Sequence, residues 1–263
     1  MAVLNVHEWG PGDGPACLVI HGVQNTGARY RRLAQEGLPE CRMLAVDLRG
    51  HADSLWDAPW NTETHVADII ETMEALDLQR VPVIGHSFGG MLATHLAATV
   101  PERITGLALL DPAVALDPSA ATAAADDVRR DEGWATPDEA FEARAAVRPP
   151  HAVDTVEEDL RVFMRLDPDG RYRFAFSRPA AVTAWGELAR PPVSLADYSG
   201  SVLVMTALQA NLVNDQLRTS LRSDLGDRFS EVGIDAGHML FWDAFEETVV
   251  RLRTFLGLPA PAA

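Results

Sequence analysis

Lysine is absent from this sequence of 263 residues, in which all 22 basic residues are arginine. Its absence excludes Schiff-base catalysis, a lysine general base and the lysine of a phosphate-binding P-loop. Positive charges are also outnumbered, since 38 acidic residues against 22 basic ones give a formal net charge of −16. Such a chain repels nucleic-acid phosphates and anionic lipid surfaces, so we expect no nucleic-acid partner and no membrane partner.

Cysteines and long hydrophobic runs are also few. Cys17 and Cys41 each begin an apolar run, which favours two small buried side chains over a disulfide framework. No apolar run approaches the ~18 residues of a membrane-spanning helix, and the first residues, MAVLNVHEWGPGDGP, lack the pattern of a secretory signal. We therefore expect a soluble, cytoplasmic protein.

Short apolar runs alternate with helical patterns along much of the chain. Runs that are apolar on both faces are typical of buried parallel strands. We expect strands at 16–22, 43–47, 81–85, 104–111, 201–208 and 228–235. Helices are expected over 64–78, with Thr62 as the candidate cap, and directly after Ser87. This alternation predicts an α/β fold with a doubly wound, mostly parallel sheet.

The rhythm of strands and helices breaks between residues 112 and 200, which are rich in Ala, Asp, Glu and Pro. Helical spacing recurs there at 137–147 and 156–166, before prolines that mark a return to the sheet. We therefore expect a core made of residues 1–111 and 201–263, into which residues 112–200 are inserted as a helical unit.

The segment VIGHSFGG, residues 83–90, places the pattern G-x-S-x-G between an expected strand and an expected helix. Gly85 and Gly89 permit a sharp turn that lifts Ser87 clear of the sheet, at a helix N-terminus that favours a developing anion. The alternative is a helix-capping serine in a glycine-rich turn. The strand and helix around the motif favour Ser87 as a nucleophile.

A serine nucleophile needs a base, and His238 follows the last expected strand in the sequence AGHM. A loop at that place can carry the imidazole over the sheet toward Ser87. A buried structural histidine is the alternative. The remaining histidines lack metal-ligand spacing and no dinucleotide-binding pattern follows the first strand, so we expect neither a metal nor a cofactor.

Four segments, VIHGVQ, DLRGHADS, VIGHSFGG and DAGHMLFW, occur in the order in which they resemble the α/β-hydrolase fold family, and the resemblance covers nearly the whole chain. It implies that residues 112–200 form a lid over the substrate pocket. It also implies that Asp47 and Arg49 fix a structural turn, in which Ala52 replaces a glycine that many relatives have.

The same resemblance implies that the backbone N–H groups of Val23 and Phe88 stabilise the oxyanion of a tetrahedral intermediate, each by on the order of 3 kcal/mol. We expect a second set of residues to contact the substrate: His21, Gly22, His86, Asn211 and Trp185. For His21, a polar strand end without a role in binding is an equal alternative. Several large side chains of the insertion are expected either at an apolar pocket wall or in the insertion's own core: Trp134, Phe141, Phe163, Met164, Tyr172, Phe174 and Trp185.

The acid that should support His238 is not evident. Relatives usually have Asp in the loop after the strand that matches 201–208, where this chain has Asn211. Asparagine orients a neutral imidazole but cannot balance its positive charge. Asp111 ends the strand expected at 104–111 and matches the acid of other relatives, although Asp-Pro also suits a turn. We assign Asp111, and Asn211 and Asp215 stay open as alternatives.

These residues favour a serine hydrolase that cleaves an ester or lactone of a small apolar molecule through an acyl-enzyme. A C–C bond hydrolase and a non-hydrolytic ligand-binding protein, in which Asn211 marks a degenerate acid position, are the alternatives. The net negative charge disfavours polyanionic substrates unless a local arginine reverses it. The sequence does not indicate an oligomeric state.

Overall fold

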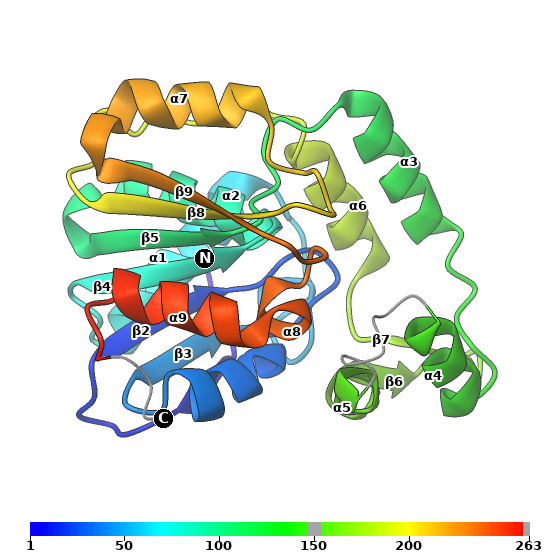
Figure 1. Ribbon diagram of the computed structural model, residues 1–263. Coiled ribbons are helices and arrows are strands. Elements are labelled where there is room, and N and C mark those ends of the chain that lie inside the picture. The colour runs from blue at the N-terminus through cyan, green and yellow to red at the C-terminus, as the bar shows by residue number, and fades with distance from the viewer. Residues whose placement is uncertain (147–153, 260–263) are drawn as a thin grey trace.

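The computed structural model describes residues 1–146 and 154–259. Its centre is a seven-stranded sheet with the strand order β1-β3-β2-β4-β5-β8-β9 (Figure 1). All strands run parallel except β1, which pairs antiparallel with β3 at the edge. The strands are β1 (Val6–Trp9), β2 (Ala16–Ile20), β3 (Arg42–Val46), β4 (Val81–His86), β5 (Ile104–Leu110), β8 (Ser201–Ala207) and β9 (Phe229–Ile234).

This mostly parallel sheet confirms the predicted fold class, and each expected strand is present. Strand β1 was not predicted. It has only four residues, VHEW, and its side chains are half-buried or exposed, so it lacks the continuous apolar run that marks the buried strands. An antiparallel edge strand of this kind leaves almost no signal in the sequence.

Helices cover both faces of the sheet (Figure 1). Buried side chains of α1, α2 and α7 pack on one face, and those of α8 and α9 pack on the other together with the helical turns η1 and η2. The helices on the two faces are α1 (Thr62–Ala75), α2 (Phe88–Thr99), α7 (Asp215–Leu225), α8 (Leu240–Asp243) and α9 (Phe245–Phe255). The short helical segments are η1 (Gly27–Tyr30), η2 (Leu33–Gly37), η3 (Pro101–Arg103) and η5 (Gly226–Arg228).

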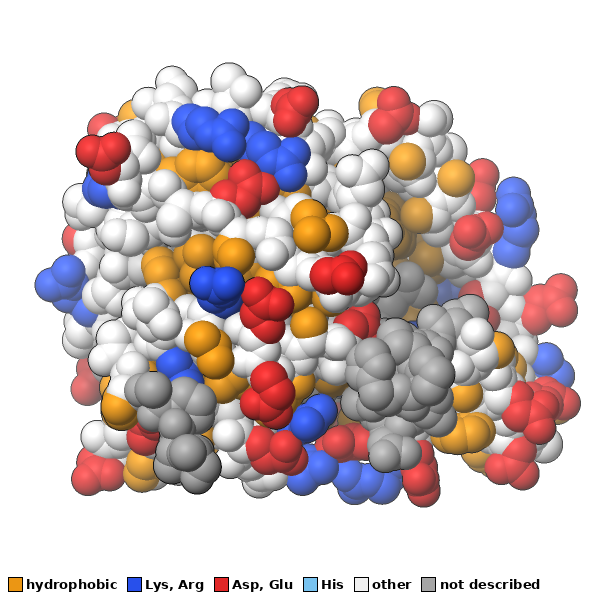
Figure 2. Space-filling view, in the orientation of Figure 1, with side chains coloured by type: hydrophobic (Ala, Val, Ile, Leu, Met, Phe, Trp, Pro, Cys, Tyr) orange, Lys and Arg blue, Asp and Glu red, His pale blue; other side chains and the backbone are white. Residues whose placement is uncertain are grey.

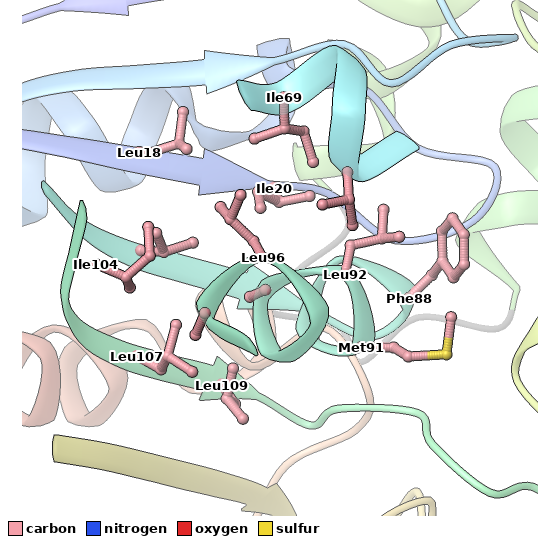
Figure 3. Close-up of a cluster of buried hydrophobic side chains, with 14 of the residues drawn as sticks. Leu18, Ile20, Ile69, Phe88, Met91, Leu92, Leu96, Ile104, Leu107 and Leu109 are labelled. Carbon is pink, nitrogen blue, oxygen red and sulfur yellow. The ribbon is translucent and has the colours of Figure 1, made fainter. Parts of the chain in front are cut away.

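Alternation along the strands distributes the core between the two faces. Leu18 and Ile20 point toward α2, whereas Val19 belongs to the opposite cluster. Figure 3 shows Leu92 and Leu96 of α2 among side chains of the sheet. Each fully buried aliphatic side chain of this kind contributes about 1.5–3 kcal/mol. Cys17 and Cys41 are buried free thiols, as expected.

The segment between β5 and β8, which we call the insertion, lies beside the carboxyl ends of the central strands (Figure 1). Its elements are α3 (Pro118–Arg129), α4 (Pro137–Ala145), α5 (Asp154–Phe163), β6 (Met164–Leu166), β7 (Tyr172–Phe174) and α6 (Arg178–Glu187). The helix expected over 156–166 ends early, because Met164 begins a strand that pairs with β7. Val147, at the end of another expected helix, lies outside the described residues.

Thr62 is not the cap of α1, contrary to expectation. It is the first helical residue, and Asn61 precedes it at the cap position. The hydroxyl and the N–H of Thr62 both donate to the carboxylate of Glu187 in the insertion, over 2.6 and 3.0 Å. The start of α1 therefore anchors the insertion to the core. In the described part of the chain, no helix is long and apolar enough to span a membrane.

A buried ion pair fixes α1 to the loop after β3. The guanidinium of Arg49 donates to both carboxylate oxygens of Asp68 over 2.6 and 2.8 Å, and the side chains are 5% and 0% exposed. Two parallel hydrogen bonds of this kind combine charge with fixed geometry. The role of Arg49 in the turn therefore depends on a partner in a helix nearly twenty positions away, which the sequence analysis did not identify.

We expect Asp68→Ala to lower the free energy of unfolding by about 3 kcal/mol or more, because it leaves the Arg49 cation buried without its carboxylate. Urea denaturation at neutral pH measures the change. Glu74→Ala on the same helix is the control, since its ion pair is long, 3.7 Å, and its side chain is 66% exposed. A loss for Asp68→Ala no larger than for the control would contradict the expectation.

Candidate active site

Ser87 occupies a strained turn between β4, the central strand, and α2. Its backbone angles are φ 55° and ψ −118°, a conformation that residues with a side chain rarely adopt. Hydrogen bonds on both sides hold it there: its N–H donates to the carbonyl oxygen of Leu110, and its own carbonyl accepts from Gly90. The turn therefore presents Ser87 at the middle of the carboxyl edge of the sheet.

Three glycines permit this turn because backbones pass too closely for side chains. A Cβ atom on Gly89 would lie 2.1 Å from the carbonyl oxygen of Ile20, and one on Gly85 would lie 2.5 Å from the carbonyl oxygen of Gly89. A Cβ on Gly22 would lie 2.9 Å from Cβ of Ser87. The loop after β2 thus packs directly against the serine.

Asp111 lies beside His238. The imidazole Nδ1–H donates to Oδ2 of Asp111 over 2.6 Å, and the carboxylate is fully buried. The other oxygen, Oδ1, accepts the N–H of Ala207 over 3.1 Å. Because Nδ1 carries the proton toward the carboxylate, Nε2 of the neutral ring is left as a proton acceptor.

The two alternative acids lie elsewhere. Asn211 is exposed in the loop after β8, and the side chain of Asp215, at the start of α7, is 98% exposed and pairs with Arg218. Asp111 reaches the histidine because a left-handed backbone, φ 42°, turns it back over the sheet after β5. The structure therefore brings Asp111, and neither alternative, to His238.

His86 packs against His238 with ring centroids 4.5 Å apart. Its Nε2–H donates to the backbone carbonyl of His238 over 2.9 Å, so it holds the loop that carries this residue. Burial lowers the pKa of His86 well below its usual value, and the neighbouring His238 lowers it further. His86 is therefore neutral, and its Nδ1 has no hydrogen-bond partner among the described residues.

Two buried histidines support the loop after β2. His51 accepts the N–H of Gln24 at Nε2 and donates from Nδ1 to the carbonyl of Arg49. His21 donates from Nδ1 to the carbonyl of Gly22 and accepts the N–H of Leu48. Fully enclosed, His21 does not line the cavity beside Ser87, so its position matches a structural role rather than contact with a substrate.

Asp47 ties the same loop to the end of β3. Its carboxylate accepts the hydroxyl of Thr26 over 2.6 Å, the N–H of Gly27 over 2.8 Å and a ring N–H of His7 over 3.0 Å. The expected turn around Asp47 is present. The sequence did not indicate that its carboxylate would reach Thr26 and Gly27, because these contacts depend on neighbouring strands.

A cavity of about 270 Å³ opens beside Ser87. Several predicted site residues line it: Gly22, Val23, His86, Ser87, Trp185 and His238. Asn211 does not line the cavity. Phe88 is the first residue of α2, and its backbone N–H has no acceptor within the helix. No pattern in the sequence indicates the polar side chains of the wall: Gln24, Asn25, Arg29 and Arg144. Nothing in RYRR, residues 29–32, distinguishes Arg29 from its neighbours.

The large side chains of the insertion divide between the wall and its own core. Phe174 and Trp185 line the cavity, whereas Phe163 is enclosed at 1% exposure in the insertion's hydrophobic cluster. Trp134 lines a neighbouring hollow, which shares Gln24, Arg144, Phe174 and Trp185 with the first. Within residues 1–146 and 154–259, His, Cys, Asp and Glu side chains form no group arranged to hold a metal ion.

Comparison with known proteins gives matches along the whole chain. The sequence pattern of the family described as the alpha/beta hydrolase fold matches residues 15–245. The chain is 37% identical to the lipase LipV of Mycobacterium tuberculosis, over 97% of this chain and 98% of that protein. It is also 28% identical to a 3-hydroxybutyrate-oligomer hydrolase of Cupriavidus necator, over 88% and 85% of the two chains.

Solved structures agree with these sequence matches. The crystal structure of E-2-(acetamidomethylene)succinate hydrolase superposes with a TM-score of 0.83 at 22% identity, over 97% of this chain and 95% of that one. An esterase from a marine microorganism superposes with a TM-score of 0.77 at 17% identity, over 97% and 100%. At these identities the similarity concerns the fold.

We expect Gly89→Ala to destabilise the protein by about 3 kcal/mol or to prevent folding, because the new methyl group would overlap the carbonyl of Ile20. Gly186→Ala is the control, since a Cβ there meets nothing within 4 Å. The control should match or slightly exceed wild-type stability, because alanine favours a helix by about 0.5–1 kcal/mol. Thermal unfolding measures both, and a stable Gly89→Ala protein would refute the close approach.

Buried histidines should make stability depend on pH. Burial lowers the pKa of His51 to about 4 and that of His21 to about 3, from 6.5. Between these values and 6.5 the unfolded chain binds protons that the folded chain does not, so stability is complete above pH 6.5 and falls toward pH 4. Each histidine contributes a slope of about 1.4 kcal/mol per pH unit.

Urea denaturation between pH 7.5 and pH 4.5 tests this dependence. We expect His51→Gln to reduce the slope by about 1.4 kcal/mol per pH unit, because one titrating group is removed. The control is His7→Gln, which replaces a partly solvated histidine. Burial lowers the pKa of His7, but its hydrogen bond to Asp47 and the charge of that carboxylate raise the pKa above its usual value. A slope that is the same in wild type and His51→Gln would contradict the assignment.

Proposed function

The chain belongs to the α/β-hydrolase fold family and is a hydrolase, and on this premise we propose that it is a serine esterase. It cleaves the ester or lactone bond of small, largely apolar molecules through an acyl-enzyme. One observation carries the proposal: the buried carboxylate of Asp111 accepts the Nδ1–H of His238, and His238 and the strained Ser87 line one cavity.

In the proposed mechanism, Ser87 Oγ attacks the ester carbonyl while Nε2 of His238 takes its proton. The imidazolium that forms is stabilised by the carboxylate of Asp111, because solvent screens the attraction between two buried charges only weakly. His238 then returns the proton to the leaving alcohol. Water attacks the acyl-enzyme by the same route, with His238 again as the base, and releases the acid.

Two backbone N–H groups stabilise the oxyanion in this proposal. Phe88 supplies its amide from the first turn of α2, and Val23 supplies its amide from the loop that His51 fixes through Gln24. Because backbone donors are held by the fold, they need no reorganisation when charge develops on the carbonyl oxygen. His86 acts as a positioning residue, since it holds the carbonyl of His238.

The insertion serves as the lid in this proposal, because its side chains Arg144, Phe174 and Trp185 complete the cavity wall. A non-hydrolytic, ligand-binding role is disfavoured, since the reason for considering it was a missing acid at Asn211. Asp111 supplies a carboxylate in contact with His238. A C–C bond hydrolase would use the same residues, and its products would distinguish it.

We expect Ser87→Ala to abolish hydrolysis of short-chain 4-nitrophenyl esters and labelling by a fluorophosphonate probe. Asp111→Asn should lower kcat by about 10⁴, because asparagine cannot balance the imidazolium. Steady-state kinetics measures both effects, and thermal unfolding verifies that each variant is folded.

Asn211→Asp is the matched control, because it adds a carboxylate at the exposed position after β8. Its kcat should stay within about twofold of wild type, as for most surface substitutions. A large gain in rate would instead identify position 211 as the acid site. Full labelling of Ser87→Ala would overturn the proposed nucleophile.

A further inference from the structure

A second hollow adjoins the cavity of Ser87. Its volume is about 370 Å³, against about 270 Å³ for the cavity beside the serine. The two share four lining side chains: Gln24, Arg144, Phe174 and Trp185. The rest of the second hollow's wall, as far as the structure describes it, belongs to the insertion. The mechanism proposed above leaves this space without a role.

The inner wall of the second hollow is apolar. Val128 of α3 and Phe176 are only 4% and 6% exposed, and both belong to the hydrophobic cluster of the insertion. Trp134 meets Phe174 edge to face, with ring centroids 5.6 Å apart. A concave wall of aromatic and aliphatic side chains suits an apolar group of a ligand.

The charged side chains at this hollow are of both signs. Asp127 and Asp131 line it together with Arg144. Asp127 is 82% exposed, and its carboxylate pairs with Arg130 over 3.6 Å. Figure 2 likewise shows acidic and arginine side chains interspersed over the visible face of the insertion. A wall of mixed sign has no single charge with which to select an ion, so its apolar interior favours an uncharged occupant.

The position of His238 decides which part of an ester can enter the second hollow. In the proposed mechanism His238 returns its proton to the leaving alcohol, so the alcohol lies beside the imidazole while the acyl group stays on Ser87. His238 and Met239 line the first cavity but not the second. The second hollow therefore adjoins the cavity on a side that His238 does not line, where the acyl group can extend.

We infer that the two hollows form one binding site for an acyl chain, so that the enzyme prefers esters of uncharged, medium-chain fatty acids to acetates. The inference rests on the proposed esterase function and narrows its substrate class. The ester carbonyl lies beside Ser87, and the chain passes Phe174 and Trp185 and ends against α3. Each methylene that leaves water for an apolar wall raises kcat/KM by up to about fourfold.

An acyl-chain series tests the inference: 4-nitrophenyl acetate, butyrate, hexanoate and octanoate. In wild type, kcat/KM for the octanoate should exceed that for the acetate by roughly tenfold or more, the effect of burying about two methylenes. Ala124→Phe should lower this ratio by roughly tenfold or more. Ala124 lines the second hollow from α3 and is half-buried, so a phenyl ring there occupies the space of the chain.

Ala123→Phe is the matched control, because it makes the same substitution on the same helix at an exposed side chain outside both walls. Its octanoate-to-acetate ratio should equal that of wild type. Thermal unfolding verifies that each variant is folded, and Ala124→Val, with a smaller side chain, should lower the ratio less than Ala124→Phe.

An alcohol-chain series, ethyl, butyl and hexyl acetate followed by pH-stat titration, tests the acyl assignment. Its chain-length dependence should be the same in wild type and Ala124→Phe. A change confined to these alkyl acetates would overturn the assignment. A wild-type kcat/KM that does not rise from acetate to octanoate, or an unchanged ratio in Ala124→Phe, would overturn the inference while the esterase proposal stands. Hydrolysis of none of these esters would overturn the esterase proposal itself.

Discussion

The close packing of three backbone segments around Ser87 is the constraint on which the rest of the site depends. The turn after β4 lies against the end of β2 and the loop after it at separations that only glycine at 89 and 22 allows, and Gly85 lets the turn fold back on Gly89. This contact sets the position of the serine, of the helix N-terminus behind it and of the loop in front of it. The strain in the turn is supported by the central strands of the sheet, which contribute buried side chains to the clusters on both faces.

Polar groups buried beneath the site keep this arrangement in register. Asp47 and His51 hold the loop after β2, and His86 holds the loop of His238. Each of these side chains is nearly inaccessible, so an unmade hydrogen bond there would cost more than one at the surface. The arrangement explains why so many neutral histidines lie under one cavity: imidazole offers one donor and one acceptor in a rigid ring.

The sequence predicted the sheet, the sharp turn at Ser87 and the place of His238 after the last strand, because each depends on a local pattern: a continuous apolar run, two glycines, or a histidine after a strand. It failed where the outcome depends on elements distant in the chain. Strand β1 and the β6–β7 hairpin are stabilised mainly by their partners. The hydroxyl of Thr62 donates to the carboxylate of Glu187 in the insertion and does not cap its own helix.

The sequence left three candidate acids open, and the contact of Asp111 with His238 depends on the geometry of the fold. Asp111 contacts His238 since β5, which it follows, pairs with β4 and its backbone turns back over the sheet. The positions of Arg29 and Arg144 at the cavity could not be predicted, because no local sequence pattern distinguishes an arginine that lines a cavity from one on the surface. Which arginines share an aromatic ring is decided by how the insertion meets the core.

The position of Asp111 also changes the status of the loop after β8. With the contact to His238 supplied from β5, residues 210–212 have no carboxylate to hold in place, and Asn211 sits exposed at the tip. The ends of this loop are anchored, by Ala207 on one side and by Asn214, which caps α7, on the other. Lengthening a loop of this kind costs only a slowly growing closure entropy. The tip is therefore a place where additional residues can be inserted at a small cost in closure entropy.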